Sequence, residues 1–406
     1  SLCMAGHNPA QDTTPSNAMH HSHTLLRLCA LPLTVLLASC GGGDSGEPAA
    51  SVVSVQITAP TASANVFTTG APLGVRASAT VNGAAAADGT VLNFSAPSAV
   101  FVPAAPTSRA GAASSTLTSN ATGPLVVSAT VTEGGQTGSA TQTIYLRPQP
   151  GPLEILVPAY FYPSATSDWN ALTASAIAHP SVAITAIMNP NNGVFSSADA
   201  NFTRAATQFV GAGGKVLGYV YTRYGKGSRS IADIKSNIDK YLQFYGRERI
   251  SGIFLDEMAS ETSKLDFYRE IYSYIKGIDP SLRVVGNPGL IPTAGYAGIA
   301  DTLVSFEGTA ADYQKFDPRT QNAWLYTYTN RTQGMLTHNT ATCGAMQGAV
   351  QAAASARNNS GWVYATEREF NYATGVGNPW AALPTYWDAL VQTVGAVNAG
   401  ATLPRC

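Results

Sequence analysis

The feature that most constrains the fold is an alternation of short apolar runs with longer amphipathic stretches between residues 153 and 367. The longer stretches include helical candidates at 230–246 and 263–278. Parallel strands need such crossover connections, so the alternation predicts a parallel sheet. Eight strand candidates fit a (β/α)8 barrel, and an open doubly wound sheet is the structural alternative. The candidates are 153–160, 182–189, 215–222, 250–257, 282–287, 302–307, 323–330 and 361–367.

Residues 51–148 have a different composition, rich in Ala, Thr, Ser, Val and Gly. Short alternating stretches such as "LGVRASATV" and "LVVSATVT" recur there between turn residues, which predicts an all-β sandwich. The stretch "TLTSNATGPLVVSATV" resembles the bacterial Ig-like modules of surface proteins. The expected fold is therefore α/β: a (β/α)8 barrel at 151–406 preceded by a small all-β, Ig-like sandwich that acts as a spacer.

The first 40 residues are typical of a targeting segment. A start at Met19 is followed by Arg27 and by an apolar run over 28–38 that is too short to span a membrane. The run ends in "LASC", which resembles the lipobox of bacterial lipoproteins and implies a diacylated Cys40. Residues 41–50, "GGGDSGEPAA", form a flexible tether. The expectation is a bacterial outer-membrane lipoprotein, periplasmic or surface-exposed; the alternative is an ordinary signal peptide with an incidental cysteine.

Cys343 and Cys406 are the two cysteines beyond the targeting segment. Paired cysteines are common in an oxidising envelope compartment, so the pair is a disulfide candidate. Two free thiols are the alternative.

Several chemistries lack their sequence signature. The formal net charge of −1 gives no electrostatic basis for nucleic-acid binding. HExxH and paired CxxC spacings are missing, and "GAGGKV" at 211–216 precedes a strand, unlike a phosphate loop. His179 and His338 are expected to be ordinary surface residues. No metal and no organic cofactor is implied.

Carboxylates are the remaining candidates for catalytic groups, although only 12% of the residues are charged. Asp256 and Glu257 end an apolar strand candidate, and Glu307 ends another. The C-terminal face of a (β/α)8 barrel carries the active site, and glycoside hydrolysis needs two carboxylates there. Successive strand residues point to opposite sides, so one of the adjacent acids is expected to face Glu307 across the rim. The alternative for each acid is a capping or salt-bridged carboxylate.

Aromatic and amide side chains also follow the strand candidates. Aromatic faces suit sugar rings, although aromatic residues also fill ordinary cores. Arg223 is expected to bind substrate or to pair with an acid and lower its pKa. The predicted substrate-binding residues are Tyr160, Tyr162, Asn189, Tyr221, Arg223, Asn287, Tyr326 and Trp380.

With these residues in place, the region from 153 to about 390 resembles the spherulin-4 family. The matching stretches, in family order, include "VPAYFYP", "IMNPNNG", "GGKVLGYVYTRYG", "GIFLDE", "VVGNPG", "VSFEG" and "NPWAALPTYW". The resemblance implies a TIM-barrel glycoside hydrolase. Characterised fungal members cut galactosaminogalactan, an α-1,4-linked polymer of galactose, N-acetylgalactosamine and galactosamine, and related bacterial domains act on the exopolysaccharide Pel. The chain departs from the family pattern around 323–344.

The resemblance also implies roles for the acids. Asp256 would be the nucleophile and Glu307 the general acid/base of a retaining endo-hydrolase, while Glu257 would orient substrate or tune a neighbour's charge. A hydrolase for a different polymer is one alternative. Another is a non-catalytic carbohydrate-binding surface lipoprotein, an adhesin or matrix protein, because a sandwich module and an aromatic rim would suffice for binding. The partners expected are a polysaccharide and, through the lipid, the outer membrane.

Overall fold

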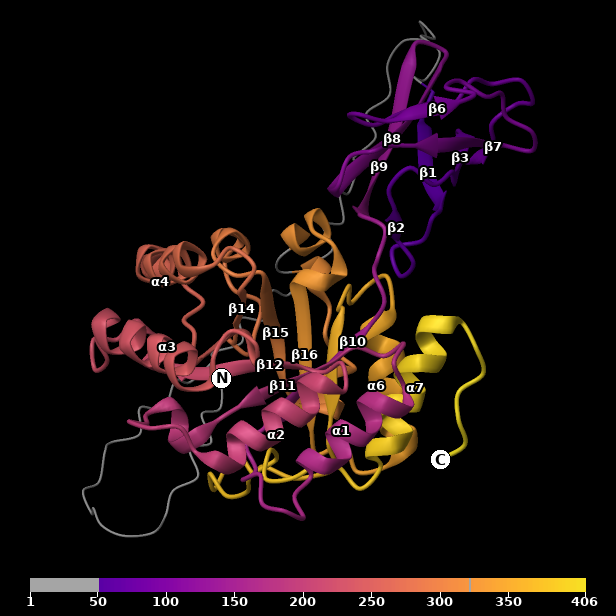
Figure 1. Ribbon diagram of the computed structural model, residues 1–406. Helices are drawn as coiled ribbons and strands as arrows, with labels where there is room; N and C mark the ends of the chain where they lie inside the picture. Colours follow the sequence, from indigo (N-terminus) through magenta and orange to yellow (C-terminus); the bar gives the residue numbers. More distant parts are fainter. Residues whose placement is uncertain (1–50, 321–322) are drawn as a thin grey trace, which may run out of the picture.

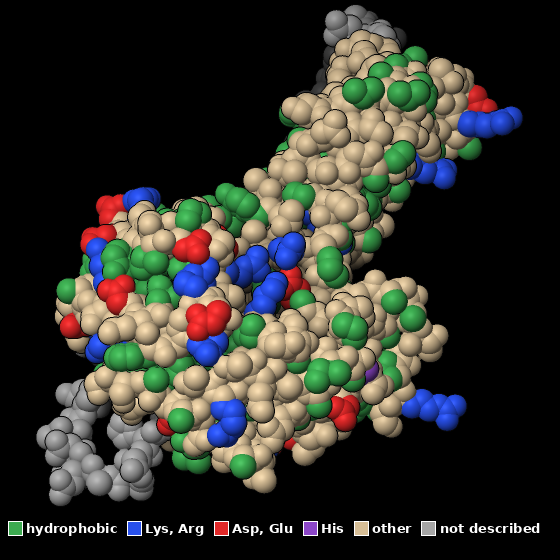
Figure 2. Space-filling view, viewed as in Figure 1, with side chains coloured by type: hydrophobic (Ala, Val, Ile, Leu, Met, Phe, Trp, Pro, Cys, Tyr) green, Lys and Arg blue, Asp and Glu red, His purple; other side chains and the backbone are tan. Residues whose placement is uncertain are grey.

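The computed structural model describes residues 51–320 and 323–406, which form an elongated β region and a barrel (Figure 1). The predicted signal segment, the tether and the lipidation site Cys40 lie outside the described residues. On the face drawn in Figure 2, charged side chains are few on the β region and more numerous on the barrel. None of the helices that the structure describes is both long and apolar enough to cross a membrane.

The β region consists of two sheets that share one apolar core. One sheet has the order β1-β3-β7-β6 with β4 paired to β3, and the other has the order β2-β9-β8-β5. Burial alternates along β8, as expected for a strand with one face on a core. The all-β prediction is confirmed, while the likeness to Ig-like modules stays a prediction. The strands are β1 Val53–Ala59, β2 Val66–Thr68, β3 Leu73–Val81, β4 Ala84–Ala85, β5 Asn93–Ser95, β6 Val100–Val102, β7 Ala112–Thr118, β8 Gly123–Glu133 and β9 Gln136–Arg147.

The second part is a closed parallel barrel of eight strands in sequence order, with β10 paired to β17. This confirms the (β/α)8 prediction and excludes the open sheet. Every residue of β10 and β11 is buried, as expected for parallel strands with helices outside and packed side chains inside. The strands are β10 Glu154–Ala159, β11 Ile184–Met188, β12 Lys215–Tyr221, β13 Ile250–Asp256, β14 Arg283–Gly286, β15 Thr302–Thr309, β16 Gln333–His338 and β17 Trp362–Ala365.

Helices cover the outside of the barrel. In α3 the Ser230 side chain and Asp233 form a capping box, and Ile234, Ile238 and Tyr241 recur at helical spacing on the buried face. The connection from β14 to β15 holds a 3-10 helix, Ala294–Gly298. The α-helices are α1 Trp169–Ala178, α2 Ala200–Gly211, α3 Ile231–Tyr245, α4 Leu265–Ile278, α5 Ala310–Tyr313, α6 Cys343–Ala354 and α7 Trp387–Ala399.

The predicted seventh strand at 323–330 is wrong. Ala323–Thr327 and Asn330–Thr332 form 3-10 helices, and the strand is β16, which begins at Gln333. The prediction that Tyr326 binds substrate fails with it. Tyr326 is fully buried, its hydroxyl donates to the Arg357 carbonyl, and its ring lies 5.2 Å from that of Tyr145 in β9.

Tyr326 belongs to the contact between the β region and the N-terminal face of the barrel. Arg319 Nη1 donates to Asn65 Oδ1 at 2.6 Å, and Arg147 Nη1 donates to Asn359 Oδ1 at 3.2 Å. The linker residue Gly151 exchanges hydrogen bonds with the Asn330 side chain just before β16. The β region is therefore fixed at the end of the barrel opposite to the rim that carries the predicted acids.

A disulfide joins Cys343, the first residue of α6, to Cys406 near the end of the described chain. Their Cα atoms are 5.5 Å apart and they are separated by 63 residues in sequence. The bond ties the segment after α7 back to α6, where Gln347 also donates to the Pro404 carbonyl.

Replacing Cys406 with Ser should lower the free energy of unfolding by about 2–4 kcal/mol, because the bond restricts the unfolded chain. Urea unfolding monitored by circular dichroism measures the change. Cys343→Ser is the matched control: each single variant and the double variant should lose the same amount, since all three remove one bond. A double variant that loses much more than either single variant would contradict this account.

Candidate active site

The amide of Asn287 joins two carboxylates at the C-terminal rim of the barrel. Asp256 ends β13 and Glu307 lies in β15, while Asn287 follows β14, the strand between them. Asn287 Nδ2 donates to Asp256 Oδ1 at 2.9 Å and to Glu307 Oε2 at 2.7 Å. Asp256 Oδ1 and Glu307 Oε2 can therefore be separated by no more than the sum of these two hydrogen-bond lengths. We expected strands four and six to lie across the rim; β14 alone separates them, so the acids share one small space.

Asp256 is 4% exposed and accepts hydrogen bonds at both oxygens, since the Tyr219 hydroxyl donates to Oδ2 at 2.7 Å. Burial raises the pKa of Asp256 to about 6; the bond from Tyr219 and the amide of Asn287 act against this rise, and the neighbouring Glu257 adds to it. Above pH 6 Asp256 is therefore ionised, with two donors fixing its orientation. Below pH 6 it holds a proton.

Replacing Tyr219 with Phe should raise the pKa of Asp256 by about one unit, because the carboxylate loses a hydrogen bond that favours its charged form. A 13C NMR titration of labelled Asp carboxyls measures the midpoint without a substrate. Tyr274→Phe is the matched control, because the Tyr274 hydroxyl donates to Asp239 on the helical surface at 2.7 Å. An unchanged Asp256 midpoint in Tyr219→Phe would show that this bond does not tune the acid.

Glu257 turns away from Asp256 in a left-handed conformation, with a φ of 52°. Such a φ is costly for a residue other than Gly and is held here by donors to its carbonyl: the Thr222 hydroxyl at 2.8 Å and the Tyr224 amide at 2.7 Å. Its side chain is fully buried, and neither carboxylate oxygen is hydrogen-bonded within the described chain. Arg223 Nε lies 3.7 Å from Glu257 Oε2, too far for a hydrogen bond but close enough for an ion pair. The structure thus pairs Arg223 with Glu257.

The predicted aromatic contacts occupy one side of the rim. Tyr160 is half-buried, with its ring 5.3 Å from that of Tyr219, and Tyr221 is half-buried under the guanidinium of Arg229. Tyr162 is exposed and its hydroxyl donates to Asp199. Asn189 follows β11, and its buried Oδ1 lacks a hydrogen-bond partner in the residues described. These side chains come from the end of β12 and from the segments that follow β10 and β11.

Tyr162 also lines a pocket of about 540 Å³ beyond this cluster. Phe195, Phe202 and Asp199 form other parts of its wall. Both Asp199 oxygens are already hydrogen-bonded, to the start of α2 and to Tyr162, so the pocket offers ring faces and an acid whose oxygens are occupied.

Trp380 does not offer a face to a sugar, as predicted for it, because it is 3% exposed. Its ring lies 5.9 Å from Tyr364 and 6.1 Å from His338, so it supports the rim from beneath. The expectation for His338 is also wrong: it ends β16, is buried, and its Nε2 lies 2.9 Å from the hydroxyl of the exposed Tyr372. Burial lowers the pKa of His338. The sequence feature that could have placed His338 at a strand end is the short apolar run "GMLTH", which ends in this polar residue.

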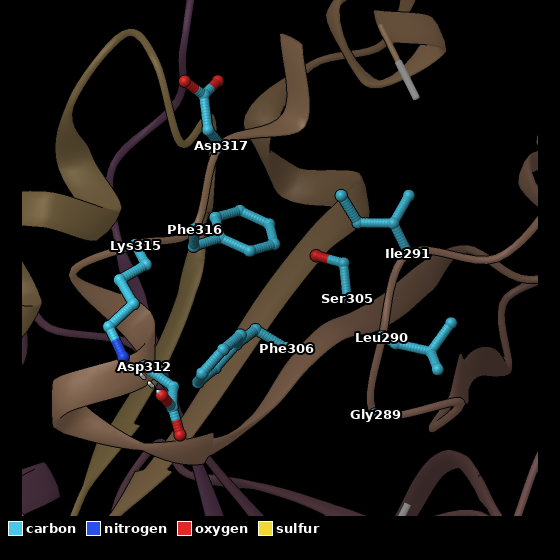
Figure 3. Close-up of a pocket in the computed structure, with 9 residues that line it drawn as sticks. All are labelled: Gly289, Leu290, Ile291, Ser305, Phe306, Asp312, Lys315, Phe316 and Asp317. Atoms are coloured by element: carbon cyan, nitrogen blue, oxygen red, sulfur yellow. Dashed lines mark hydrogen bonds and ion pairs between the residues drawn. The ribbon is translucent and has the colours of Figure 1, made fainter. Parts of the chain in front are cut away.

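A second pocket, of about 380 Å³, is lined by β15, by the segment 289–291 after β14 and by residues of α5 and the segment after it (Figure 3). Phe306 precedes Glu307 and therefore points to the opposite side, where its ring packs against those of Tyr313 and Phe316. The amide of Glu307 donates to the Gly289 carbonyl of the same pocket at 2.9 Å. Its acids are occupied, Asp312 by Lys315 and Asp317 by Arg319. This pocket supports the strand that carries Glu307 and is separate from the acid pair.

In residues 51–320 and 323–406, no three His, Cys, Asp or Glu side chains gather as a metal site would require. The chemistry that the described rim itself offers is that of two neighbouring carboxylates, one buried and one half-exposed, beside aromatic side chains. Fold and site together define a (β/α)8 barrel protein with a carboxylate pair at its C-terminal rim.

Residues 154–394 match the model of spherulation-specific family 4, and the chain belongs to this family. Spherulin-4 of Physarum polycephalum is 35% identical over 162 residues, which are 40% of this chain and 46% of the relative. The chain thus spans about half the length of that relative. A crystal structure of Aspergillus clavatus Sph3 in complex with GalNAc is 27% identical, with a TM-score of 0.51, and covers 60% of this chain and 98% of Sph3.

Proposed function

We propose that the protein is an endo-acting glycoside hydrolase that cleaves α-1,4-linked exopolysaccharide containing galactosamine or N-acetylgalactosamine, of the galactosaminogalactan or Pel type. The observation that carries the proposal is the Asn287 amide that holds Asp256 and Glu307 at one point of the rim. A protein that only binds sugar has no need of two carboxylates fixed so close together. The likeness to a GalNAc-bound relative supports the substrate class.

The spacing of the acids favours a retaining mechanism. Retaining enzymes place their carboxyls about 5–5.5 Å apart, and inverting enzymes about 6.5–9.5 Å apart. Asp256 Oδ1 and Glu307 Oε2 share one nitrogen at 2.9 and 2.7 Å, so these two oxygens lie closer together than the carboxyls of inverting enzymes. A water molecule placed between two carboxyls, as inversion requires, needs the longer range.

Each acid has an environment that suits one role. Asp256, buried and ionised above pH 6, attacks the anomeric carbon while Glu307 gives its proton to the departing glycosidic oxygen. Glu307 then takes a proton from water, whose oxygen displaces Asp256 from the sugar. Glu307 is half-exposed, so it can exchange protons with solvent between the two steps. Glu257, buried beside the pair and ion-paired with Arg223, helps to raise the pKa of Asp256 and so tunes the charge of the nucleophile.

The aromatic side of the rim binds the sugars next to the cleaved bond. Tyr160 and Tyr221 lie beside the acids, and the pocket at Tyr162 accepts a further sugar on the ring faces of its wall. Asn189 supplies an acceptor for a sugar hydroxyl or amide. Lipidation at Cys40 would hold the enzyme at the outer membrane, with the β region as a spacer.

The test is incubation of the protein with galactosaminogalactan and with Pel, followed by mass spectrometry of the released material. The expected result is a ladder of short oligosaccharides, with the α anomer as the first product seen by NMR. Release of single sugars alone would contradict endo action. Binding of both polymers without release, by folded protein, would contradict the enzyme proposal and favour a carbohydrate-binding lipoprotein.

A further inference from the structure

The N-terminal mouth of the barrel, at the end opposite to the acids, holds a cavity of about 290 Å³. Its wall is built from the first residues of several strands, among them Thr185 of β11, Lys215 of β12, Arg283 of β14 and Trp362 of β17. Arg331, just before β16, completes the ring. On the face drawn in Figure 2, Lys and Arg side chains gather near the junction of the β region and the barrel. The cavity is therefore lined by cations, whereas the opposite rim is lined by acids.

The three cations differ in how they are paired. Arg331 is paired with Glu154 at 2.9 Å. Within the described residues, neither the Lys215 ammonium nor the Arg283 guanidinium donates to a protein acceptor. The Arg283 guanidinium instead lies 4.8 Å from the ring centroid of Trp362, which fixes its plane. The two acids that act on Arg283 each have a closer cation: Glu154 is paired with Arg331, and Asp301 is paired with Lys276 at 2.6 Å.

A buried hydroxyl without a hydrogen-bond partner lies at the same cavity. Thr185 is 1% exposed, it lines the cavity, and its Oγ1 has no hydrogen-bond partner in the chain as described. Thr185 pairs in register with Lys215, and paired residues of parallel strands point to the same side of the sheet. A buried polar atom without a partner costs free energy, so such atoms usually meet a ligand or an ordered water.

We propose that this mouth is a binding site for a phosphate-type oxyanion, free or as the end of a phosphomonoester. Lys215 and Arg283 supply charge-assisted hydrogen bonds, and the Thr185 hydroxyl supplies a neutral donor. Trp362 closes one wall and leaves room beside the oxyanion for a small organic group. The site is independent of the acid pair and of the proposed hydrolysis.

Isothermal titration calorimetry of the full chain with inorganic phosphate tests the site. We expect saturable one-to-one binding, accompanied by a rise in Tm because the ligand binds the folded state. Lys215→Gln should weaken binding at least about tenfold, as a charge-assisted hydrogen bond is lost. Thr185→Val keeps the side-chain shape and should weaken it several-fold, which provides a second variant if one folds poorly.

Lys240→Gln is the matched control, since Lys240 lies on α3 and does not line the cavity. Asp256→Asn should also leave phosphate binding unchanged. Glycerol 3-phosphate distinguishes the two sources: tighter binding than phosphate identifies an ester, and equal or weaker binding identifies the free ion. Absence of saturable binding of both probes up to about 10 mM would overturn the proposal. The proposal would also be overturned if Lys240→Gln weakened phosphate binding as much as Lys215→Gln does.

Discussion

Replacing Asp256 with Asn should lower kcat on galactosamine-containing polymer by about 10⁴-fold, because the amide oxygen is a poor nucleophile. Binding of oligosaccharide should change little, since the amide has nearly the same shape and can still accept the hydrogen bond from Tyr219. Initial rates of reducing-end release give kcat, and calorimetry with oligosaccharide gives Kd.

Asp266→Asn is the control for loss of a carboxylate elsewhere, because Asp266 lies on the exposed surface of α4. It should behave like the unmodified protein. Activity of Asp256→Asn within tenfold of the unmodified protein would remove Asp256 from the reaction. A parallel loss of oligosaccharide binding would instead assign Asp256 to substrate binding.

Replacing Glu307 with Gln should lower kcat on the polymer by about 10²–10⁴-fold, since the leaving oxygen is no longer protonated. The loss should be much smaller on a dinitrophenyl α-glycoside, whose leaving group departs without a proton. In the Glu307→Gln variant the new side-chain amide oxygen can still accept the hydrogen bond that Asn287 gives to the carboxylate. The comparison of the two substrates therefore isolates the proton transfer.

Asp256→Asn is the matched variant here, because a missing nucleophile slows both substrates to a similar degree. Equal losses on both substrates for Glu307→Gln would contradict the acid/base role. In that case Glu307 would act through the position of Asn287 and Asp256.

The barrel could be predicted because short apolar runs alternate with longer helical stretches along the chain and end in polar residues. The polar ends of β13, β14 and β15 put Asp256, Asn287 and Glu307 on one face. What sequence could not give was the role of Asn287. It was expected to bind sugar, and only the order of the strands in space places its amide between the two acids.

The failure at 323–330 has a physical cause outside that segment. Trp324, Tyr326 and Tyr328 have the strand propensity of aromatic residues, yet this segment packs on the β region, where Tyr326 meets Tyr145. The true strand, β16, contains Gly334 and ends in His338, so its propensity signal is weaker. Because the strand was predicted at 323–330 and not at 333–338, His338 was expected in a loop. Its contacts with Trp380 and Tyr372 could therefore not be predicted.

Fixing the β region at the N-terminal end of the barrel has a geometric consequence for a long substrate. The acids open on the end that faces away from the junction formed by Tyr145, Arg319 and Asn359. A fibre that lies over the rim can extend beyond it in both directions without meeting the β region. For the endo-hydrolase proposed above, both fragments of each cut would withdraw sideways, without any threading of a polymer end.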